Sequence, residues 1–151
     1  MDARHAAVLD AAMLAFGGSV VRTAASVIGR REGQELIVAT TRFGYSVSAL
    51  VSVRIAFVVR PRGLLRKTLA VDGSPRPLVD EILDGDAMAR LAALAPLHVE
   101  LGPNRLVFEL RYGVLADVVM TVDLVTALAK RARLVDSRAH LVVASDSQTT
   151  V

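Results

Sequence analysis

The sequence predicts an α+β protein: one antiparallel sheet with helices packed on one of its faces. The first observation is the stretch from Tyr45 to Arg60, in which apolar side chains occupy every second position. A period of two over this length is typical of a long, half-buried antiparallel strand. The second observation is a set of shorter alternating stretches on both sides of it. The third is a set of segments with apolar residues at helical spacing. The predicted order is a helix, a three-stranded meander, a helix pair, a β-hairpin and a long C-terminal helix.

The first half of the chain supplies the first helix and the meander. Gly17 and Gly18 end the helix, because glycine readily adopts the left-handed conformation of a C-cap. The polar stretch Gly29 to Gly33 forms a hairpin turn, and Pro61 ends the long strand. The predicted segments are a helix over Ala3 to Phe16 and strands over Ser19 to Ile28, Glu35 to Phe43 and Tyr45 to Arg60.

The second half supplies the helix pair, the hairpin and the last helix. Pro77 suits a first helical turn, and Asp86 is expected to cap the helix that follows. Gly102, Pro103 and Asn104 form the hairpin loop. The predicted segments are a short edge strand over Thr68 to Val71, helices over Pro77 to Leu83 and Ala87 to Ala95, strands over Leu97 to Leu101 and Arg105 to Arg111, and a helix over Asp117 to Leu134.

Length and composition limit the classes of protein that fit. The 151 residues suffice for one domain with a real core. We expect a single α+β domain over residues 1–135 and a poorly ordered tail over residues 136–151. The absence of cysteine excludes disulfides, thiol catalysis and cysteine–zinc sites. No uncharged apolar run approaches the roughly 20 residues of a membrane-spanning helix, so we expect a cytoplasmic protein.

The densest basic cluster is a candidate surface for an anion or a partner. It consists of Arg60, Arg62, Arg66 and Lys67. Acidic lipid headgroups, RNA and an acidic protein would all be attracted to it, and a plain solvated loop is the alternative. No aromatic residues are interleaved to stack on bases, so we expect no nucleic acid partner. A membrane surface stays open as an alternative.

Two further sets of residues are candidates for a ligand site. A pocket between the sheet and the last helix would be lined by Val53, Ile55, Phe57, Val122 and Val125. His98 and Glu100 share the outward face of a strand and are the nearest approach to an acid–base pair, with a solvated strand face as the alternative. The three histidines have no second ligand at metal spacing, and no nucleophile elbow is present. We therefore predict no catalytic residues, no metal and no cofactor.

The second half resembles an uncharacterised bacterial α+β domain family, and the first half is similar too. The resemblance is carried by Leu69 to Gly73, Leu78 to Leu94, the stretches LHVEL and RLVFEL, Leu124 to Leu134, and the turn Gly29 to Gly33 before LIVATT. The family has no assigned activity, so the resemblance implies a fold and no mechanism. Its relatives often sit beside membrane segments. The order of elements also resembles that of type III secretion chaperones, which points to partner binding by topology alone.

These observations favour a non-catalytic bacterial domain. We expect it to bind a protein partner as an adaptor, or itself as a homodimer, because it combines a surplus of apolar residues with an absence of catalytic motifs. The alternative is a small-ligand or lipid-binding domain that uses the pocket between the sheet and the last helix.

Overall fold

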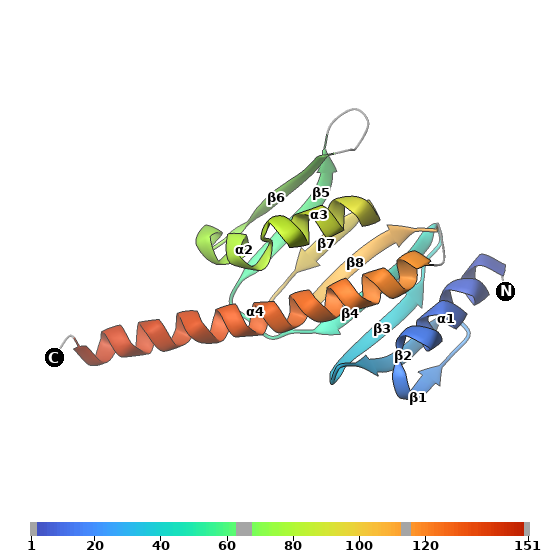
Figure 1. The fold of residues 1–151 in the computed structure, drawn as a ribbon, viewed down its shortest axis with the longest axis horizontal. Coiled ribbons are helices and arrows are strands. Elements are labelled where there is room, and N and C mark those ends of the chain that lie inside the picture. The colour runs from blue at the N-terminus through green and yellow to red at the C-terminus, as the bar shows by residue number, and fades with distance from the viewer. Residues whose placement is uncertain (1–2, 63–67, 113–115, 150–151) are drawn as a thin grey trace.

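The computed structural model describes residues 3–62, 68–112 and 116–149. It shows one eight-stranded antiparallel sheet in the order β1-β2-β3-β4-β8-β7-β5-β6. The predicted α+β class is confirmed, and Figure 1 shows all four helices of the described chain on the same side of the sheet. The strands are β1 (Gly17–Arg22), β2 (Ser26–Arg31), β3 (Gln34–Thr40), β4 (Gly44–Leu50), β5 (Ala56–Arg62), β6 (Thr68–Ser74), β7 (His98–Leu101) and β8 (Arg105–Arg111). The helices are α1 (Ala3–Ala15), α2 (Arg76–Ile82), α3 (Gly85–Leu94) and α4 (Ala116–Thr149).

The single long strand predicted over Tyr45 to Arg60 is wrong, because the structure divides it into β4 and β5. The hairpin β7–β8 is inserted between them in the sheet. The segment between β4 and β5 runs along the loop of the β7–β8 hairpin. There the N–H groups of Val51 and Val53 donate to the carbonyls of Asn104 and Pro103 at 3.0 and 3.3 Å. Burial still alternates through this segment, so the pattern identifies the buried face correctly without identifying the paired strands.

The strand predicted over Ser19 to Ile28 is also wrong, because this stretch is a hairpin formed by β1 and β2. The turn is held by Thr23, whose Oγ1 accepts hydrogen bonds from the N–H groups of Ala25 and Ser26 at 3.2 and 3.0 Å. A threonine turn of this kind lacks the glycine, proline or asparagine that marks most turns. The turn predicted over Gly29 to Gly33 is shorter in the structure, because β2 continues to Arg31; Glu32 and Gly33, which both have positive φ angles, join β2 to β3.

The helix pair lies close to its predicted position, but its cap differs. Asp84 caps α3, where its side chain accepts a hydrogen bond from the N–H of Ala87 at 2.9 Å. Asp86, the residue expected to cap this helix, lies inside its first turn instead. The predicted edge strand is present as β6, which pairs with β5 alone.

The last helix is much longer than predicted, because α4 continues past Leu134 to Thr149. Residues beyond the expected boundary at 135 contact the rest of the protein: Asp136 accepts a hydrogen bond from the N–H of Arg54 at 3.0 Å, and Arg138 lies 3.6 Å from Glu81. The end of α4 extends beyond the sheet in Figure 1. That residues 136–151 are poorly ordered stays a prediction.

One hydrophobic core fills the space between the sheet and the helices. The largest fully buried side chains include Phe57, Phe108, Leu9 and Leu124, which come from β5, β8, α1 and α4. Gly29 belongs to this packing, because a Cβ at this position would collide with the ring of Phe16. No helix in the described part of the chain is long and apolar enough to cross a membrane.

Candidate binding surface on the helix-free face

The face of the sheet opposite the helices is the candidate binding surface. Strand register places one outward-facing residue from each of seven strands in a line across it. We call this line the central row; it consists of Ile28, Ile37, Ser48, Val107, Glu100, Val58 and Asp72, in order from β2 to β6. Four of these seven side chains are aliphatic. Ile37 is 39% exposed, and the other three aliphatic residues are half-buried.

Charged residues flank the central row on both sides. On β8, Arg105 and Glu109 lie two positions before and two positions after Val107, so both point outward from the same strand. On β2 and β3, Arg30 lies opposite Glu35. From β2 to β8, the face therefore carries a mainly aliphatic line with charges of both signs beside it.

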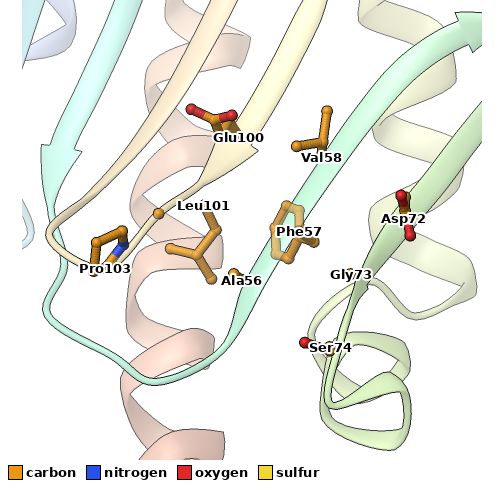
Figure 2. Close-up of a pocket in the computed structure, with 10 residues that line it drawn as sticks. Ala56, Phe57, Val58, Asp72, Gly73, Ser74, Glu100, Leu101 and Pro103 are labelled. Carbon is orange, nitrogen blue, oxygen red and sulfur yellow. The ribbon is translucent and has the colours of Figure 1, made fainter.

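Three neighbouring hollows follow this line and together form a groove. The first has a volume of about 470 Å³ and lies over β5, β6 and β7; Figure 2 shows it from the helix-free side, with α4 behind the strands. The second, of about 250 Å³, is lined mainly by Ile28, Ile37 and Leu50. The third, of about 310 Å³, lies between them. It shares Glu100 with the first hollow and Arg105 with the second.

Six charged side chains on this face have no ion-pair partner among the described residues, although Glu100 of the same face lies near His98. On the helix side, carboxylates pair with basic residues: Asp123 with Arg31 at 2.9 Å, and Asp84 with Arg131 at 2.7 Å. Among the described residues, no ion pair or side-chain hydrogen bond involves these six outward charges of the helix-free face: Glu35, Asp72, Glu109, Arg60, Arg105 and Arg111. These side chains are available to a partner without first breaking an internal contact.

The predicted basic cluster lies partly on this face. Arg60 and Arg62 are exposed near the end of β5. Arg66 and Lys67 lie outside the described residues, so the cluster as a whole stays a prediction.

The five residues predicted to line a pocket are all buried in the core. Val122 and Val125 of α4 are fully buried, and Val53 is 8% exposed. Ile55 and Phe57 belong to the same core cluster. Phe57 also contributes to the lining of the hollow over β5, β6 and β7. A ligand pocket between the sheet and α4 stays a prediction.

His98 and Glu100 both lie on β7 and face outward, as their spacing predicts. His98 Nε2 lies 3.7 Å from Glu100 Oε1, and the side chains are 24% and 53% exposed. Glu100 lines two of the hollows, whereas His98 lies in the flanking row opposite Glu109. Within the described chain, no three histidine or carboxylate side chains gather closely enough to hold a metal ion.

The clearest pKa shifts in the described chain lie away from this face. Burial raises the pKa of Tyr45, although a contact with Thr121 Oγ1 at 3.5 Å opposes the shift. The N–H of Ala87 lowers the pKa of Asp84. Tyr45 contacts α4 and Asp84 caps α3, so both pKa shifts concern residues that stabilise the fold.

Sequence reasoning did not find the central row, because it follows from strand pairing. Ile37 and Val107 are far apart in the chain, and only the register through Ser48 aligns them. One signal was present: Leu50 and Val58 interrupt the polar face of the stretch from Tyr45 to Arg60. Aliphatic residues at positions expected to face solvent can indicate an apolar surface of this kind.

The fold defines a class: an α+β domain whose large antiparallel sheet is covered by helices on one face. No protein-family model matches the chain, and no curated protein matches it in sequence. Among solved structures, it is similar to the mycobacterial trehalose monomycolate transport factor A, TtfA. The match has a TM-score of 0.54 and 13% sequence identity, and it covers 77% of this chain and 75% of that chain. It shows a shared fold; the resemblance to secretion chaperones stays a prediction.

Proposed function

We propose that the protein is a non-catalytic binding protein that holds a protein partner on the helix-free face of its sheet. The observation that carries this proposal is the aliphatic central row flanked by unpaired charges of both signs. Covering Ile37 and its neighbours would remove apolar surface from water, which favours association. The flanking charges would select the partner and fix its orientation more than they would add affinity.

The charge pattern favours a polypeptide over a polyanion. Glu35, Glu109 and Asp72 lie among the arginines of this face and would repel phosphate groups brought close to them. The largest of the three hollows is also open and lies on an exposed sheet face, whereas small-molecule sites enclose most of their ligand. The name of the similar solved structure, a transport factor, is compatible with a binding role.

Photocrosslinking in the host cells tests this proposal. A photoreactive residue placed at Ile37 should give covalent protein adducts of defined mass. The same residue at Ala127, which is exposed on α4, is the matched control and should give none. The adducts at position 37 should disappear when Leu50→Asp adds a charge to the groove. Equal labelling from both positions, or none from position 37, would contradict the proposal.

A further inference from the structure

We propose that the partner on the helix-free face is a second copy of this chain, packed sheet against sheet. This inference rests on the proposed function and adds the identity of the partner. It follows from the order of charges on β8 about the central row, which matches this strand to a rotated copy of itself. A closed two-fold dimer uses the same patch on both copies, so the patch must be complementary to itself.

The charge complementarity comes from β8. A two-fold axis that lies between two facing sheets, parallel to the central row, turns every strand end for end. Val107 then faces Val107 of the copy. Arg105, two positions before it, faces Glu109 of the copy, and Glu109 faces Arg105 of the copy. The axis thus produces two ion pairs from side chains that have no ion-pair partner among the described residues.

The same axis places aliphatic residues against each other on the neighbouring strands. Ile28 and Ile37 would meet their own counterparts, because both lie in the central row. Ser48, between Ile37 and Val107, is small enough to let the two sheets approach. Two facing sheets pack about 10 Å apart with their strands roughly 30° from parallel, a spacing that aliphatic side chains fill.

The acidic end of the row locates the edge of this interface. Glu100 and Asp72 would face their own counterparts if the contact extended over β7 and β6. We therefore centre the contact on β3, β4 and β8, so that sheet twist separates the outer strands. The hollow over β5, β6 and β7 would then lie at the hydrated rim, where charged residues are common.

The mass of the purified full chain in solution is the first test. Light scattering across a range of concentrations should show a dimer that dissociates on dilution. Ile37→Asp should give a monomer with an unchanged circular dichroism spectrum. The matched control is Leu14→Asp, because Leu14 is 86% exposed on α1, on the other side of the sheet, and this variant should remain a dimer. A monomer at every concentration overturns the inference, and so does a dimer that Ile37→Asp leaves intact.

Charge reversal tests the two-fold register itself. Arg105→Glu and Glu109→Arg should each weaken the dimer by about tenfold or more, because each variant creates two like-charge contacts. The double variant restores opposite charges and should return towards the wild-type dissociation constant. An equimolar mixture of the two single variants should form mixed dimers. Loss of dimerisation in the double variant would overturn the register.

Failure of this inference is distinguishable from failure of the proposed function. A monomeric protein that still gives adducts at position 37 in cells, with masses that do not match a second copy, binds another protein on this face. That result would overturn self-association and leave the proposed function standing.

Discussion

At the scale of single residues, Gly29 shows how one missing side chain shapes the core. It lies within β2, and the ring of Phe16 occupies the space that a Cβ would need. Gly29→Ala should therefore destabilise the protein by about 1–3 kcal/mol, the usual cost of overpacking a core. The measurement is the free energy of unfolding in urea.

Gly85→Ala is the matched control for this substitution. Gly85 begins α3, and a Cβ there meets nothing within 4 Å. Because alanine favours helices more than glycine does, this change should leave stability unchanged or raise it slightly. An equal loss of stability in both variants would contradict the role assigned to Phe16.

Asp84 is the second residue for which the structure predicts a measurable effect. The N–H of Ala87 lowers the pKa of this carboxylate below its ordinary value of 3.8, with a smaller contribution from Arg131. Because the pKa is lower in the folded protein, the ionised carboxylate stabilises the fold above about pH 4, and this stabilisation is lost as the pH falls through the folded pKa. Asp84→Asn should lower the melting temperature at pH 7, and the difference from wild type should shrink at lower pH.

Asp86→Asn provides the control for the pH experiment. Asp86 lies in the first turn of the same helix and is not its cap. Its substitution should change the melting temperature less than Asp84→Asn does at pH 7. If the two variants had the same pH profile, the negative charge of Asp84 beside Ala87 and Arg131 would not be the cause.

At the scale of elements, residues beyond 134 anchor α4 to the rest of the fold. Val135 is buried, Asp136 accepts from the N–H of Arg54, and Arg138 contacts Glu81. A chain that ends at Leu134 should lose about 1.5–3 kcal/mol, chiefly from the burial of Val135. A chain that ends at Arg138 should keep the wild-type free energy of unfolding, because it retains all three contacts. Equal stability of the two truncated chains would contradict this account.

The elements also show what the sequence can predict. Alternation over Tyr45 to Arg60 predicts the buried face of β4, β5 and the segment between them, because burial has a period of two in any extended chain. It does not predict the break at Leu50, since that break depends on where the β7–β8 hairpin inserts. Apolar periodicity predicts the start of α4, whereas beyond Leu134 the helix continues through a stretch in which polar residues interrupt the helical spacing of apolar ones.

The candidate site was less predictable than the fold for the same reason. The basic cluster and the pocket were inferred from residues near one another in sequence or at helical spacing. The central row joins β2, β3, β4 and β8. In the sequence, β4 ends at Leu50 and β8 begins only at Arg105. Only the long-range register brings these side chains together, and periodicity within one segment carries no information about that register.

At the scale of the whole molecule, the position of β7–β8 predicts that the fold is a single cooperative unit. The hairpin separates β4 from β5, so the sheet is continuous only when the chain beyond residue 97 has joined it. A fragment of residues 1–95 would expose the unpaired edges of β4 and β5, and exposed strand edges promote aggregation. This fragment should be insoluble or unfolded on its own, and a separate fragment of residues 96–151 should restore soluble, folded protein. The chain that ends at Arg138 serves as the control for truncation. A soluble 1–95 fragment with a cooperative melting transition would instead mean that the first half is an independent domain, to which the hairpin and α4 are later additions.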